Sequence, residues 1–64
     1  MNAPPKAVIS INAETLKHGL ADLECLVLYP LDEDGELLMI QIGDDYHVIG
    51  AHNLENYKPA EALL

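Results

Sequence analysis

The sequence has a single cysteine among its 64 residues, and it contains neither phenylalanine nor tryptophan. With Cys25 alone, no disulfide can form within the chain, and a lone cysteine is typical of proteins in a reducing compartment. Cys25 stands among apolar residues without a basic neighbour, so we interpret it as a core residue and not as a reactive thiol. A domain of this length buries only about 60% of the surface that its unfolded chain exposes. We therefore expect a core of modest stability that a partner supplements.

Basic residues are nearly as scarce. Arginine is absent, three lysines stand against 11 acidic residues, and the formal net charge is −8. Because lysine and arginine are the side chains that bind phosphate groups, this balance disfavours direct binding to nucleic acid or to an anionic membrane. No apolar run approaches the roughly 20 residues that span a bilayer, and residues 1–5 do not form a secretory signal. The expected location is the cytoplasm.

Half of the residues are hydrophobic, which is typical of a folded domain despite the net charge. The β-branched run from Ala7 to Ile11 predicts a first strand. Residues 1–5 form a short leader with two prolines, residues 6–58 the single domain, and residues 59–64 a loosely held tail that follows Pro59.

The segment after the first strand predicts a short helix near Ala13 to Leu23. Asn12 is suited to cap its start. Three leucines then follow at spacings that place them on one helical face: Leu16, Leu20 and Leu23. Gly19 offers an alternative, because glycine after a lysine and a histidine is also a signal for a helix that ends near residue 18.

The part from Cys25 to Gly50 predicts an antiparallel meander. Asp34 and Gly35 form a strong hairpin signal between two apolar runs, and a second turn at residues 43–45 leads to a further strand that ends near Gly50. Asn53 then caps a last helical turn. The resulting fold class is α+β, a small meander of about three to four strands with one face covered by the short helix. An all-β small barrel is the alternative.

Alternation along the first hairpin assigns side chains to two faces. Loops of two or four residues give the same pairing parity, which assigns the same residues to each face. The core face carries Cys25, Val27, Tyr29, Leu38, Ile40 and Ile42. The opposite face is apolar too, where a solvated face would be mostly polar. Its four large apolar residues are the predicted partner-binding site: Leu26, Leu28, Leu37 and Met39. A second subunit, another protein or the C-terminal tail could cover them.

The acidic residues gather in two groups that flank the strand Glu36 to Ile42, and we define them together as the acidic patch: Asp32, Glu33, Asp34, Glu36, Asp44 and Asp45. The strand holds the two groups roughly 20 Å apart, too far for one paired-carboxylate catalytic site. Only Asp32 and Asp34 match the ligand spacing of a calcium loop, so we interpret these residues as solvated turns.

The remaining polar residues do not form a recognisable catalytic or cofactor motif. His18, His47 and His52 are too few and too scattered for a zinc site, and an offset of five on a strand would place the last two on opposite faces. We interpret them as surface or interface histidines. Tyr46 and Tyr57 could be interface anchors.

We therefore expect a non-enzymatic protein without cofactor or metal that binds a protein partner, or a second copy of itself, through an apolar sheet face. In composition alone the chain is similar to small acidic inhibitor proteins of mobile genetic elements, some of which act as nucleic-acid mimics. That similarity implies the alternative function, occupation of the basic groove of a nucleic-acid-binding protein.

Overall fold

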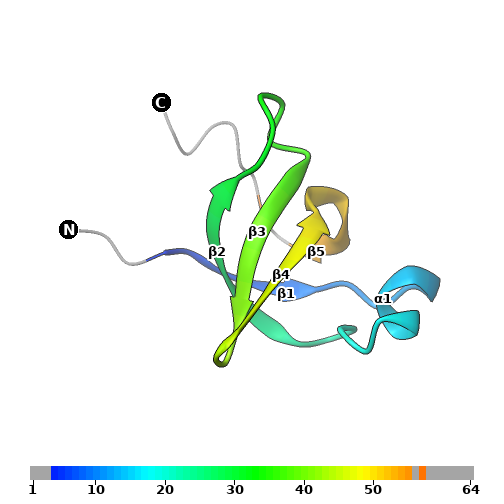
Figure 1. Cartoon of the computed structure of the whole chain (residues 1–64). Helices are drawn as coiled ribbons and strands as arrows, with labels where there is room; N and C mark the ends of the chain where they lie inside the picture. The colour runs from blue at the N-terminus through cyan, green and yellow to red at the C-terminus, as the bar shows by residue number, and fades with distance from the viewer. Residues whose placement is uncertain (1–3, 56, 58–64) are drawn as a thin grey trace.

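The computed structural model describes residues 4–55 and 57. Five strands form one antiparallel sheet in the order β4-β3-β2-β1-β5, with one short helix, α1, and one 3₁₀ turn, η1 (Figure 1). The elements are β1 (Lys6–Ile9), α1 (Ala13–Lys17), β2 (Glu24–Pro30), β3 (Leu37–Ile42), β4 (Asp45–Gly50), η1 (Ala51–Asn53) and β5 (Leu54–Glu55). The predicted α+β meander is thus present, with five strands and no closure into a barrel.

The fifth strand comes from a segment for which we expected a helical turn. Asn53 does not cap a helix; it ends η1, and the chain then pairs Leu54 with Ile9 of β1. This pairing places β5 at one edge of the sheet and leaves β4 at the other. The predicted tail, residues 59–64, and most of the predicted leader lie outside the described residues.

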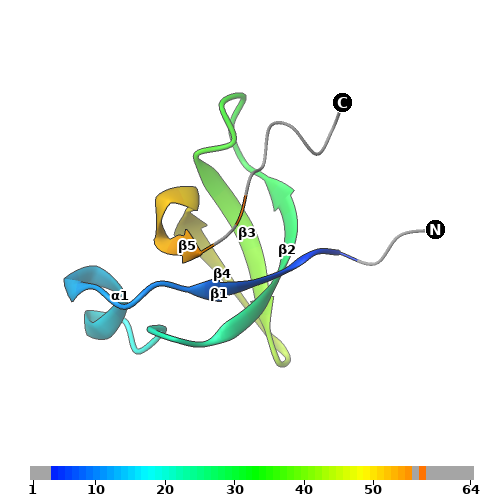
Figure 2. The same ribbon diagram turned by 180° about the vertical axis from the view of Figure 1, so that it is seen from behind.

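The hydrophobic core lies inside the curve of the sheet. It draws residues from all five strands, including both edge strands: Ala7, Ile9, Cys25, Val27, Leu38, Ile40, Ile49 and Leu54. Figures 1 and 2 show β1 crossing β3 and β4 at a steep angle from opposite viewpoints. Because residues of both edge strands reach the same cluster, the sheet bends around its own core, and we call this concave side the inner face.

The helix does not cover the sheet, contrary to the prediction. None of its five residues belongs to the core cluster, and Leu16 is 62% exposed. The helical spacing of the leucines was misleading because the helix ends at His18 and Gly19 follows with φ +73°. Gly19 therefore acts as the stop signal that the sequence offered as the alternative.

The β2–β3 hairpin departs from simple alternation twice, and the two departures cancel. Leu31 N–H bonds Leu37 C=O at 2.8 Å, so five residues form the loop, not two or four. A β-bulge between Val27 and Tyr29 then adds one residue to β2. Beyond the bulge Val27 pairs with Ile40, and the predicted core face is restored there.

Tyr29 lies on the loop side of the bulge and is not a core residue, contrary to the prediction. It pairs with Met39 and is 52% exposed. The extra residue in β2 turns its side chain to the convex side of the sheet, because an added residue reverses the alternation of faces.

The β3–β4 hairpin is regular. Ile42 pairs with Asp45 across a two-residue turn, and Gly43 adopts φ +59° at its first position, as a type II′ turn requires. The register continues without a bulge to Leu37 and Gly50. Among the described residues, no helix is long and apolar enough to cross a membrane.

Candidate functional site

The convex side of the sheet carries most of the predicted partner-binding residues. Leu37 and Met39 alternate with the buried Leu38 and Ile40, and Leu26 pairs with Gln41, which shares their side. These three predicted residues therefore lie together on one face. Leu28 is half-buried at the bulge, where the register gives it no partner in β3.

The register adds three residues to this face that we had not included. Tyr29 and Val48 pair with Met39 from either side, and Tyr46 pairs with Gln41. We define the outer face by its six large apolar side chains: Leu26, Tyr29, Leu37, Met39, Tyr46 and Val48. Leu37, Val48 and Tyr46 are 46%, 55% and 63% exposed. Tyr46 thus lies where an interface anchor would, whereas Tyr57 packs against the core.

Tyr46 and Val48 could be assigned to this face only from the pairing register of β3 with β4. Val48 is apolar and adjacent to a buried isoleucine, so the sequence alone does not say that it continues the row of Met39. Tyr29 was assigned to the other face because the bulge that reverses the alternation has no signal in the sequence. The outer face is consequently broader than predicted and spans β2, β3 and β4.

The acidic patch is divided between the two ends of β3, as predicted. All six of its carboxylate residues are exposed. Asp32 also has a structural role, since its Oδ1 accepts a hydrogen bond from Glu36 N–H at 2.8 Å and a longer one from Leu37 N–H at 3.5 Å. The loop therefore uses one carboxylate to order its backbone.

A pocket of about 290 Å³ lies between the β1–β2 connection and β4. One wall contains Glu14, Thr15, His18 and Leu20, and the other contains residues 47–50 of β4, with Leu37 and Asn53 completing the lining. His47 pairs with Ile40 and so points to the inner side of β4. The pocket brings together two histidines that we had interpreted separately, His18 and His47, whereas His52 lies outside its lining.

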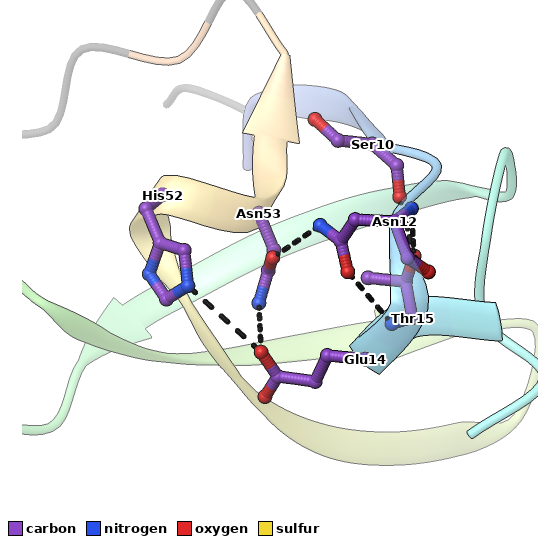
Figure 3. Close-up of polar contacts among 6 residues, drawn as sticks. All are labelled: Ser10, Asn12, Glu14, Thr15, His52 and Asn53. Carbon is purple, nitrogen blue, oxygen red and sulfur yellow. Dashed lines mark hydrogen bonds and ion pairs between the residues drawn. The ribbon is translucent and has the colours of Figure 1, made fainter. Parts of the chain in front are cut away.

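Asn53, which lines this pocket, connects η1 to the start of α1 (Figure 3). Its side chain is 1% exposed; Oδ1 accepts a bond from Asn12 Nδ2 at 2.8 Å, and Nδ2 donates to Glu14 Oε1 at 3.4 Å. Its backbone C=O accepts from Ser10 N–H at 2.7 Å. Asn53 thus positions the Glu14 carboxylate at the pocket.

Asn12 and Thr15 fix the same corner from the other side. They form a reciprocal capping box, in which Asn12 Oδ1 accepts from Thr15 N–H and Thr15 Oγ1 accepts from Asn12 N–H, both at 2.9 Å. Thr15 Oγ1 also donates to Ser10 C=O at 2.7 Å. The capping position of Asn12 was readable from the sequence, but its contact with Asn53 was not, because 41 residues separate the two.

Cys25 is a buried thiol on β2. Burial, together with the neighbouring Glu24 carboxylate, raises the pKa of the Cys25 thiol, which disfavours the reactive thiolate. Glu14 Oε1 lies 3.9 Å from His52 Nε2, an ion pair only when the imidazole is protonated. Within the part of the chain that the structure describes, no three histidine, cysteine or acidic side chains are arranged to hold a metal ion.

Comparison of the chain with protein-family models finds no match, and comparisons with curated proteins and with solved structures find none either.

Proposed function

We propose that this protein is a non-catalytic protein-binding module that acts through the outer face. The observation that supports this most is the row Tyr29, Met39 and Val48, in which apolar side chains from three adjacent strands lie side by side and two remain more than half exposed. Fully burying one such side chain contributes about 1.5 to 3 kcal/mol. A partner that covers the row would gain a large part of the stability of a small complex.

Substitutions of exposed outer-face residues test this proposal without disturbing the core. A Tyr29→Ser, Leu37→Ser double variant removes two exposed apolar side chains and changes no charge. Leu16→Ser is the matched control, because Leu16 is an exposed leucine on α1, away from the outer face. Partner capture from the source cells, quantified by mass spectrometry, should lose the partner with the double variant and retain it with the control. Equal capture by both variants would contradict the proposal.

The second candidate function is mimicry of nucleic acid. It is favoured by the exposure of both acidic groups at opposite ends of β3, roughly 20 Å apart along the strand. A Glu33→Gln, Asp34→Asn variant tests it and leaves the structural Asp32 in place. Mimicry expects partner binding to weaken about tenfold, mainly through slower association, and to collapse as salt rises. Binding that is indifferent to salt and to this variant would exclude it.

A further inference from the structure

The edge of the sheet at β4 presents unpaired backbone groups to solvent. Ala51 N–H bonds Glu36 C=O directly opposite, which makes this a hydrogen-bonded pair of the β3–β4 ladder. Hydrogen-bonded and non-bonded pairs alternate along an antiparallel ladder. The N–H and C=O groups of Tyr46 and Val48 therefore point away from β3, and among the described residues neither takes part in a hydrogen bond outside the strand ladders.

This edge lacks the features that usually block strand addition. Natural edge strands are kept short, carry lysine or proline, or contain a bulge. β4 has six residues, contains neither lysine nor proline, and pairs with β3 without a register shift. The opposite edge strand, β5, has only two residues. β4 is thus the long and regular edge of this sheet.

The pocket lies directly along this edge. Its lining takes four consecutive residues of β4, His47 to Gly50, together with Glu14 and His18 across the gap. Figures 1 and 2 show α1 on the side of β4 that faces away from β3. A strand added to β4 would therefore run between β4 and α1, alongside residues that line the pocket. About 290 Å³ is at the lower limit for small-molecule sites, which suits one side chain better than a cofactor.

The negative charge of Glu14 at the pocket favours binding of a cationic side chain. Both contacts of the Glu14 carboxylate, with Asn53 and His52, involve Oε1, and within the described part of the chain Oε2 has no hydrogen-bond partner. None of the described lysines forms an ion pair with Glu14. The protein as a whole carries a formal charge of −8, so a second copy would be repelled and a basic segment of another protein attracted.

We propose that β4 receives an extended basic segment of a partner protein as an additional strand, with a lysine or arginine of that segment seated in the pocket against Glu14. This deepens the proposed function and depends on the domain being a protein-binding module. Side chains of an added strand alternate between the two sides of the sheet. The basic side chain enters the pocket on the side of His47, while its neighbours in the segment pack beside Tyr46 and Val48 on the outer face.

The probe is a library of short synthetic peptides with β-branched and tyrosine residues around one fixed lysine, compared with the same library carrying norleucine instead. The lysine peptides should bind and the norleucine peptides should bind at least tenfold more weakly. Glu14→Gln should reduce the affinity of the lysine peptides about tenfold, because it removes the charge and keeps the acceptor for Asn53. Glu55→Gln gives the same net charge on the opposite edge strand, outside the pocket lining, and should leave the affinity within twofold.

Backbone pairing is tested at Val48. Val48→Pro removes an outward N–H that β3 does not use, and Val48→Ala is the control that keeps this N–H. Proline should abolish peptide binding and alanine should retain most of it, with the amide NMR spectrum confirming that both variants fold. If the proline variant does not fold, amide hydrogen exchange of the peptide-bound wild type decides. Strand addition must protect the amides of Tyr46 and Val48 from exchange with solvent.

Absence of binding by every lysine peptide, or binding unaffected by Glu14→Gln and without protection of the β4 edge, would overturn this inference. The inference about the β4 edge can fail while the proposed function survives. A cellular partner that is lost with the Tyr29→Ser, Leu37→Ser variant but is indifferent to changes at Glu14 and Val48 would leave the outer face as the binding site and exclude the β4 edge.

Discussion

Asn53 is the one amide side chain that is fully enclosed in the described structure, and both ends of it are hydrogen-bonded. Asn53→Ala should lower the free energy of unfolding by about 2 kcal/mol, because it leaves a partly buried Asn12 amide without its acceptor and opens a small cavity. Chemical denaturation measures the loss. His52→Ala is the neighbouring control and should change stability by less than about 0.5 kcal/mol, because His52 is exposed.

Cys25 gives a prediction about pH. Its raised pKa means that the unfolded chain loses the thiol proton first as the pH rises through the ordinary value, 9.0. Ionisation of the unfolded chain alone disfavours the folded state. The free energy of unfolding is therefore unaffected well below pH 9 and falls above it, by at most about 1.4 kcal/mol per pH unit. Unfolding measured between pH 7 and pH 10 should show this extra decline in the wild type and not in Cys25→Ala. Parallel curves for the two proteins would refute it.

At the scale of the elements, the exposure of Leu16 on α1 predicts that this helix contributes little apolar burial to stability. Leu16 and Leu20 are four residues apart, but Leu20 packs against the core while Leu16 on α1 is exposed. Leu16→Ala should change the free energy of unfolding by less than about 0.5 kcal/mol, and Leu20→Ala should cost about 1 to 3 kcal/mol. Thermal denaturation of the two variants distinguishes them, and an equal loss would mean that α1 does cover apolar surface.

Strands β1 to β4 and the positions of the turns between β2, β3 and β4 were the predictable elements of this fold. Alternation from Cys25 onward and the glycines at 35 and 43 mark the meander, because period-two patterns and turn residues act locally. The bulge in β2 was not predictable, since it depends on how Tyr29 meets Met39 across the hairpin. The leucine spacing failed for a local reason as well: both Gly19 and Asp22 have positive φ, which interrupts any longer helix.

The candidate sites also divide into a part that local sequence patterns predict and a part that depends on contacts between distant segments. Leu26, Leu37 and Met39 follow from alternation along their own strands, so the sequence assigned them to one face. The pocket has no local signal. It forms only where the β1–β2 connection meets β4, and the contacts that hold Glu14 there come from Asn53, 39 residues later.

At the scale of the whole molecule, charge decides whether outer faces of two copies can associate. Each copy carries a formal charge of −8, so self-association should be weak at low salt and should increase as salt screens the repulsion. Sedimentation velocity at about 50 and 500 mM sodium chloride measures this dependence. Binding of a basic segment has the opposite dependence on salt. A dimer that is stable at low salt would show that apolar burial outweighs the charge and would favour the homodimer as the occupant of the outer face.

The pairing of β1 with β5 governs when this chain can fold. Val8 lies opposite Glu55, so the first and last strands of the sheet become neighbours only after almost all of the described chain is available. Contacts between residues so distant in sequence slow folding, because loop-closure entropy is lost before they form. During synthesis the β2–β4 meander can pair early, whereas Ile9 and Leu54 complete the core last. Until then the nascent chain exposes both the inner and the outer faces of the meander, and this is the interval in which chaperones or early binding of the partner would matter most.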